Sequence, residues 1–186
     1  MASVHPLPPG EPVALHDRAM DNLRFIRETM ERAGSFTAVS GWGEVAVGVT
    51  ALIAAALASR QDSASAWLTV WGIEALVALV IGGFTVAWKA RAASLPLLSG
   101  PGRKAALSLA PALVAGALLT GVLFSEGIVA PLPGIWLLLF GTGIIAAGTY
   151  SVKIVPVMGL CFMAVGTFAL IAPPEWGNAV MAFGFG

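Results

Sequence analysis

The chain has 186 residues, of which 58 % are hydrophobic and only 11 % are charged, whereas about 25 % of the residues in an ordinary soluble domain are charged. This composition excludes a typical soluble globular protein. Ten Lys and Arg balance ten Asp and Glu, so the chain lacks the basic surface that nucleic-acid binding requires. The chain has a single cysteine, which excludes an internal disulfide and a Cys/His zinc site. Its two histidines both precede the long apolar segments, which excludes a bis-histidine haem within the membrane. We therefore expect an integral membrane protein without a cofactor.

The chain begins with two parts that differ from the apolar remainder. Residues 1–12 are rich in proline and predict a disordered head. Residues 13–34 have the pattern of an amphipathic helix, with an apolar face that includes Leu15, Met20, Leu23, Ile26 and Met30. Four acidic residues balance four arginines there, so the helix lacks the excess positive charge that favours anionic lipid. The favoured interpretation is docking of this face on protein; a helix at the membrane interface and a lipid sensor are the alternatives.

Residues 36–186 form the third predicted part, a transmembrane helical bundle. Its five long apolar segments cover about residues 36–59, 66–88, 105–125, 133–150 and 154–172. A bilayer core of about 30 Å needs about 20 helical residues, so the last two segments are on the short side. A sixth apolar piece, residues 176–186, is too short to span and predicts a half-helix or part of a longer helix. The expected fold is all-α: five full spans plus a partial or truncated sixth, preceded by the amphipathic helix.

The positions of Lys and Arg predict the orientation of the chain. Nine of them precede the first segment or lie in the second and fourth connections, whereas the first, third and fifth connections hold only Arg60. The positive-inside rule then places the N-terminus and the connection around residues 89–104 in the cytoplasm. Three tryptophans, Trp67, Trp136 and Trp176, lie near the starts of outside-to-inside segments, where interfacial indoles are common.

Two carboxylates fall inside apolar segments, where an ionisable side chain costs about 3 kcal/mol or more and marks a candidate functional site. Glu74 lies eight residues into the second segment, on a helical stripe with Trp67 and Trp71. This stripe predicts that two indole N–H donors lie on the same side as the carboxyl group. Glu74 either carries protons or a solute through the membrane, or has no transport role and is a protonated, hydrogen-bonded contact between helices or lies in a water-filled notch. The second alternative is the commoner one for such a residue.

Glu44 lies near the predicted cytoplasmic end of the first segment, directly after Gly41-Trp42-Gly43. An ion pair with Lys89 or Lys153 is its favoured role. A relay to Glu74 through a water molecule is the alternative, and it requires the first two helices to face one another.

Two rows of small residues at four-residue spacing predict close helix contacts within the bundle. The rows are Ala46, Thr50, Ala54 and Ala58 in the first segment, and Ser108, Ala112, Gly116 and Thr120 in the third.

The run HDRAMDNLRFIRETMERAGSFTAV at residues 16–39, with Gly41-Trp42-Gly43 after it, resembles the opening of a set of small bacterial multi-span membrane proteins that have no assigned activity. The resemblance covers about 30 residues at the start of the chain. It implies a location in the bacterial inner membrane and a last helix longer than the final apolar piece. It transfers no functional residue.

Two functional hypotheses follow from the sequence. In the leading one, the chain is a non-enzymatic membrane protein that acts through assembly, as a homo-oligomer or as an accessory subunit of a larger inner-membrane complex. In the alternative, it is a small transporter or channel that conducts protons or a small solute past Glu74, with Glu44 and Trp71 as further candidate residues. The sequence offers no residues in support of an enzyme acting on lipid.

Overall fold

The computed structural model describes residues 20–26, 41–92, 100–149, 151–152 and 154–186. The chain separates into two compact units, Met1–Ser35 and Phe36–Gly186. In the first unit, residues 20–26 are helical, as the amphipathic pattern predicts. Three members of the predicted docking face are at least half exposed there, namely Met20, Leu23 and Ile26. The other two, Leu15 and Met30, lie outside the described residues.

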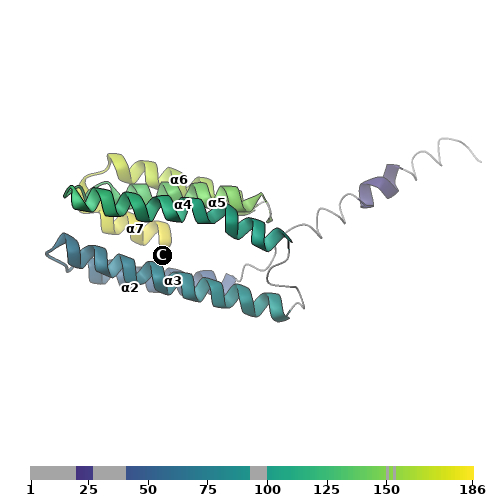
Figure 1. The fold of residues 1–186 in the computed structure, drawn as a ribbon, viewed down its shortest axis with the longest axis horizontal. Coiled ribbons are helices and arrows are strands. Elements are labelled where there is room, and N and C mark those ends of the chain that lie inside the picture. The colour runs from purple at the N-terminus through teal and green to yellow at the C-terminus, as the bar shows by residue number, and fades with distance from the viewer. Residues whose placement is uncertain (1–19, 27–40, 93–99, 150, 153) are drawn as a thin grey trace, which may run out of the picture. The chain divides into compact units, whose positions relative to one another are not determined.

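The second unit consists of helices joined by short connections (Figure 1). The helices are α2 (Gly41–Ala58), α3 (Ala64–Ala92), α4 (Gly100–Ser125), α5 (Leu132–Gly148), α6 (Ile154–Ile171) and α7 (Gly177–Phe185), with the 3₁₀ turn η1 (Pro174–Trp176) before α7.

Four of these helices, α2, α3, α4 and α6, are long and apolar enough to cross a membrane. The fifth expected span is the shorter α5, whose 17 apolar residues rise by about 26 Å. The all-α fold is therefore confirmed, and four of the five expected spans are helices long and apolar enough to cross a membrane. By helix length and hydropathy, the chain is a multi-pass membrane protein.

Helices α4, α5 and α6 form one layer, in which α5 contacts both of its neighbours (Figure 1). The contact between α5 and α6 depends on glycines. A Cβ atom on Gly141 would lie 2.6 Å from the carbonyl oxygen of Gly159, and one on Gly166 would lie 2.8 Å from the backbone nitrogen of Leu138. The absence of side chains at these positions allows the two backbones to approach closely.

Helices α2 and α3 form a second, antiparallel layer, and α7 lies between the two layers (Figure 1). Helix α7 contacts α2 on one side and both α5 and α6 on the other. The buried core surrounds it, and its members are Ala54, Ala55, Ala58, Trp71, Leu137, Val180 and Met181. Because α7 supplies two of these side chains, it is the central element that joins the two layers.

The small-residue rows face neighbouring helices, as predicted. In α2, Ala54 and Ala58 belong to the buried core. In α4, Ala112 lies against α5, because a Cβ atom on Gly143 would lie 3.0 Å from the Cβ atom of Ala112. These rows are contact faces within the bundle.

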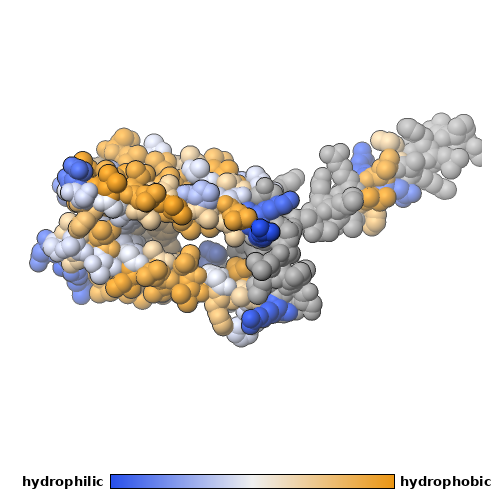
Figure 2. All heavy atoms as spheres, in the orientation of Figure 1, coloured by the Kyte–Doolittle hydropathy of each residue, from blue (hydrophilic) through white to orange (hydrophobic). Residues whose placement is uncertain are grey.

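The two ends of the second unit carry opposite charge. At one end lie the α2–α3, α4–α5 and α6–η1 connections, and we call it the acidic end for its Asp62, Glu126 and Glu175, which outnumber Arg60. At the other, the basic end, α3 finishes and α4 begins, with Lys89, Arg91, Arg103 and Lys104. Figure 2 shows hydrophilic side chains at both ends and a mainly apolar surface between them. Which end faces the cytoplasm stays a prediction.

Candidate functional site

Glu74 lies near the middle of the α2–α3 hairpin, far from either charged end. It is ten residues after the start of α3, or about 15 Å along the helix. Its side chain is half buried and faces α2. The hydroxyl of Thr50 donates a hydrogen bond to Glu74 Oε1 over 2.9 Å. Thr50 itself lies eight residues before the end of α2, or about 12 Å from it.

The Thr50 hydroxyl has two hydrogen-bond acceptors within reach. Its Oγ1 lies 2.9 Å from the carbonyl oxygen of Val47 and 2.9 Å from Glu74 Oε1. A hydroxyl carries a single proton but accepts through two lone pairs. Thr50 can therefore donate to an ionised Glu74, or donate to Val47 and accept a hydrogen bond from a protonated Glu74. The same arrangement of heavy atoms serves both protonation states of the carboxyl group.

The carboxyl group of Glu74 has unused hydrogen-bonding capacity. An ionised carboxylate offers about four acceptor sites, and among the described residues only Thr50 supplies a hydrogen bond to it. A polar group that serves only to hold helices together is expected to have its partners inside the bundle. The free capacity of Glu74 is available to water or to an ion.

The two predicted indole donors do not bond to Glu74 in this structure. Both instead donate to the side-chain oxygen of Asn178, over 2.8 Å from Trp67 Nε1 and 3.3 Å from Trp71 Nε1. The physical reason is the insertion of α7, which places an amide oxygen beside the first two turns of α3. Trp67, Trp71 and Glu74 share one stripe of α3, as the sequence predicts, and the indoles of that stripe bond to the amide of α7 rather than to the carboxyl group. We call Trp67, Trp71 and Asn178 the indole–amide cluster.

A second indole contact joins the layers at the acidic end. The rings of Trp67 on α3 and Trp136 on α5 are stacked, with centroids 5.5 Å apart and planes 9° from parallel. Trp136 Nε1 also donates to Thr120 Oγ1 on α4 over 2.8 Å. The starts of α3 and α5 are thus held together by tryptophans that the sequence indicated only as interfacial residues.

A cavity of about 350 Å³ opens at the acidic end. The α2–α3 and α4–α5 connections contribute to its lining, together with η1 and the starts of α3, α5 and α7. The lining residues are Ala58, Ser59, Gln61, Asp62, Ser63, Ala64, Trp67, Val129, Ala130, Pro133, Pro174, Gly177 and Asn178. We call it the acidic-end cavity. Asp62 is the charged residue in this lining. Two members of the indole–amide cluster, Trp67 and Asn178, also line the cavity.

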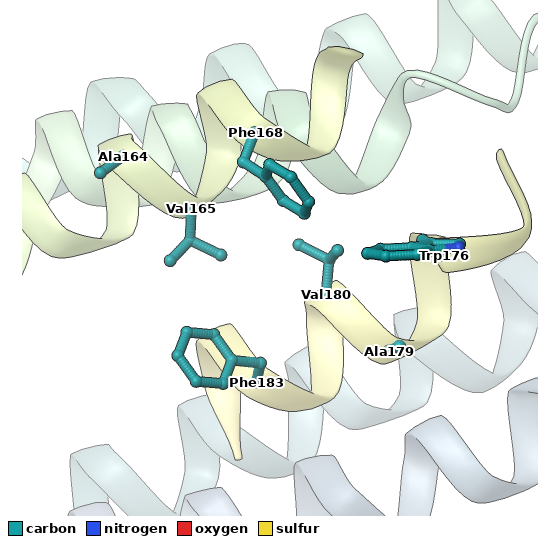
Figure 3. A pocket seen from close by; sticks show the side chains of 7 residues that line it. All are labelled: Ala164, Val165, Phe168, Trp176, Ala179, Val180 and Phe183. Atoms are coloured by element: carbon teal, nitrogen blue, oxygen red, sulfur yellow. The ribbon is translucent and has the colours of Figure 1, made fainter. Parts of the chain in front are cut away.

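A second cavity, of about 450 Å³, lies between α6 and α7 and is apolar. Figure 3 shows its lining, in which Val165 and Phe168 of α6 lie opposite Val180 and Phe183 of α7, with Trp176 at one end. The ring centroids of Phe168 and Trp176 are 6.0 Å apart. Trp176 contributes the one side-chain hydrogen-bond donor of this lining, its indole N–H, and the other six lining residues are apolar, so the groove suits mainly apolar groups.

Glu44 lies one turn into α2 near the basic end, and its side chain is exposed. Helices α2 and α3 do face one another, as a relay between the two glutamates would require. Glu44 is, however, six residues before Thr50, or about 9 Å along the α2 axis. Its pairing with Lys89 stays a prediction, and Lys153 lies outside the described residues.

The described residues contain no group of three or more His, Cys, Asp or Glu side chains that could hold a metal ion. Asn178 is the functional candidate that the sequence analysis missed. Its one signal is a carboxamide in the first turn of an otherwise apolar terminal segment.

Comparison with known proteins adds no family: no protein-family model, curated protein or solved structure matches the chain. The resemblance of its opening residues to small bacterial membrane proteins therefore stays a prediction. Any functional inference rests on the residues themselves.

Proposed function

We propose that the chain is a proton-conducting transporter or channel in which Glu74 carries the proton within the membrane. The observation that supports this proposal most is the shared hydroxyl of Thr50, 2.9 Å from both Val47 O and Glu74 Oε1. A carrier must be stable with and without its proton, and this pair has a hydrogen-bonding arrangement for each state.

The depth of Glu74 gives the second reason. An ionisable side chain at the centre of a spanning helix costs about 2.5 to 3.5 kcal/mol on insertion scales. A purely structural contact between α2 and α3 would form equally well between uncharged amides or hydroxyls. A carboxyl group whose partner among the described residues is one hydroxyl is better explained as a group that exchanges protons with water.

The test is a proton flux assay in proteoliposomes that contain a trapped pH-sensitive dye. Glu74→Gln keeps the shape and hydrogen-bonding capacity of the side chain but removes its titration, and we expect it to reduce the flux to that of empty liposomes. Thr50→Val removes the hydroxyl and should lower the flux by about fivefold to tenfold, the worth of one hydrogen bond. Thr50→Ser keeps the hydroxyl and is the matched control. Equal flux in the parent and in Glu74→Gln, with both folded, would reject the proposal.

A second candidate function is assembly with another protein, as the sequence analysis favours. The observation in its support is the exposure of Met20, Leu23 and Ile26 on the helical residues 20–26. An apolar face that its own compact unit leaves open is suited to a second copy or to another membrane subunit. Deletion of residues 13–33 should change the mass of the oligomer in detergent while membrane insertion is retained. An unchanged mass counts against assembly through this helix.

Both candidate functions are non-enzymatic, and both are proposed for the bacterial inner membrane with the N-terminus in the cytoplasm. The orientation rests on the excess of Lys and Arg at the basic end. It is tested with Arg103→Cys in a Cys161→Ala background, because an impermeant maleimide should not label this position in intact cells. Labelling at position 103 would show that the basic end faces away from the cytoplasm, opposite to the proposed orientation.

A further inference from the structure

We propose that the acidic-end cavity is the route by which small cations reach Glu74, and that the indole–amide cluster is the barrier between them. This inference rests on the proposed function, since it names the access route to the same carboxyl group. It assigns roles to Asn178, Trp71 and Asp62 that conduction past Glu74 does not by itself require.

The charge of the cavity favours cations over anions. Asp62 lies in its lining, and the described residues contribute no Lys or Arg to that lining. The acidic end as a whole carries Glu126 and Glu175 against the single Arg60. A concave surface with an excess of one sign of charge raises the local concentration of counter-ions. Protons carried by water and small monovalent cations are therefore the expected occupants.

Glu74 does not line the cavity, and Trp71 lies between the cavity-lining Trp67 and Glu74 along α3. Trp67 and Asn178 line the cavity, whereas Trp71 does not and is only 4 % exposed. Trp67, Trp71 and Glu74 follow one another at spacings of four and three residues on one face of α3. The carboxyl position is thus about 10 Å farther along the helix than Trp67, with the Trp71 indole one turn before it.

The two indoles of this barrier share one hydrogen-bond acceptor. Asn178 Oδ1 accepts from both indoles, and the hydrogen bond from Trp71 is the longer of the two. If the amide oxygen is removed, the buried Trp71 N–H loses its partner, and an unsatisfied buried donor is costly. Without this hydrogen bond, the present orientation of the Trp71 indole is less favourable. Rotation of the indole then opens the route from the cavity to Glu74.

The experiment measures access to position 74 with Ag⁺, a monovalent cation that bonds to a cysteine sulfur with release of the thiol proton. It uses the full chain in vesicles, with Glu74→Cys in a Cys161→Ala background. The readout is the rate at which Ag⁺ added at the acidic end protects the cysteine from later maleimide labelling in detergent. A Ser63→Cys variant in the same background reports the orientation and the unhindered rate, because Ser63 is exposed in the cavity lining.

We expect slow protection of Glu74→Cys alone and an about fivefold to tenfold faster rate when Asn178→Leu is added, the effect of one lost hydrogen bond. Trp71→Phe removes the indole N–H while keeping an aromatic ring, and it should also accelerate protection if Asn178→Leu does not fold. Trp176→Ala is the matched control. It removes an indole at the same end that packs on Phe168 and does not line the cavity, so it should leave the slow rate unchanged.

Two results would overturn the inference. Protection of Glu74→Cys at the Ser63→Cys rate with the cluster intact would show that no barrier exists. Slow protection that persists with both Asn178→Leu and Trp71→Phe would show that the cavity does not lead to Glu74. Neither result depends on flux, so a failure of this inference is distinguishable from the failure of Glu74→Gln to abolish conduction.

Discussion

The two layers of the bundle are held together in different ways. In the α4–α6 layer, glycines such as Gly141 and Gly159 bring backbones into direct contact. In the α2–α3 layer, an ionisable side chain and a hydroxyl meet between the helices. A backbone contact without side chains has few alternative arrangements, whereas a carboxyl–hydroxyl pair has at least two. Close backbone packing thus fixes one layer, whereas the other contains an ionisable group between its helices, and α7 lies between the two.

The largest expected change in the free energy of unfolding comes from weakening the packing of α5 on α7. Leu137 on α5 is fully buried, and a Cβ atom on Gly184 of α7 would lie 2.5 Å from its Cδ2 atom. Leu137→Ala should lower the free energy of unfolding by about 2 to 5 kcal/mol, as for other buried leucines. Reversible denaturation in mixed micelles measures this change, and a loss below about 1 kcal/mol would contradict the central role of α7.

A smaller loss is expected from adding one methyl group between α5 and α6. In Gly141→Ala the new Cβ atom would meet the carbonyl oxygen of Gly159, and overpacking of this kind costs about 1 to 3 kcal/mol. The matched control is Gly83→Ala on α3, where no atom lies within 4 Å of the new Cβ. The control should be neutral or stabilising, because alanine favours helix over glycine by about 1 kcal/mol. Equal melting temperatures for the two variants would contradict the view that the α5–α6 contact depends on glycine while α3 does not.

The hydrogen bond between Trp136 and Thr120, which lies within the α4–α6 layer, should contribute less. Trp136→Phe keeps an aromatic ring against Trp67 but removes the hydrogen bond to Thr120. We expect a loss of about 0.5 to 1.5 kcal/mol in the free energy of unfolding. A double-mutant cycle with Thr120→Val measures the bond itself, and strictly additive losses would mean that the two side chains do not interact.

The smallest effect on stability is expected at the site itself. Hydrogen bonds between membrane helices are worth about 0.6 kcal/mol on average, so Thr50→Val should scarcely change the melting temperature. Its effect on proton flux should be several times larger in relative terms, because the hydroxyl serves both states of Glu74. A large fall in melting temperature with unchanged flux would mean that Thr50 and Glu74 stabilise the contact between α2 and α3 and do not conduct protons.

Hydropathy and turn residues predict the helices well, because each apolar run is bounded by polar residues, glycine or proline. The helix of residues 105–125 begins earlier than predicted, at Gly100, and α3 continues to Ala92. Helical hydrogen bonding continues past the apolar stretch into basic residues, which hydropathy assigns to the connection.

The candidate site is predicted only in part. Glu74 is visible in the sequence because a carboxyl group in an apolar segment is rare, and Thr50 is visible as a member of a small-residue row. Their pairing depends on the register of α2 against α3, and the choice of partner for Trp67 and Trp71 depends on where α7 inserts. Both are properties of tertiary packing, which neither periodicity nor hydropathy contains.

The unequal lengths of the helices have a consequence for the surrounding lipid. The apolar part of α3 has 26 residues and α5 has 17, which correspond to about 39 Å and 26 Å along their axes. Each layer combines a long helix, α3 or α4, with shorter ones, so the hydrocarbon thickness that the protein matches changes from helix to helix along its perimeter. Short-chain lipids should gather next to α2 and α6, whose spans have 18 residues, and a change in acyl-chain length should tilt the bundle rather than stretch it.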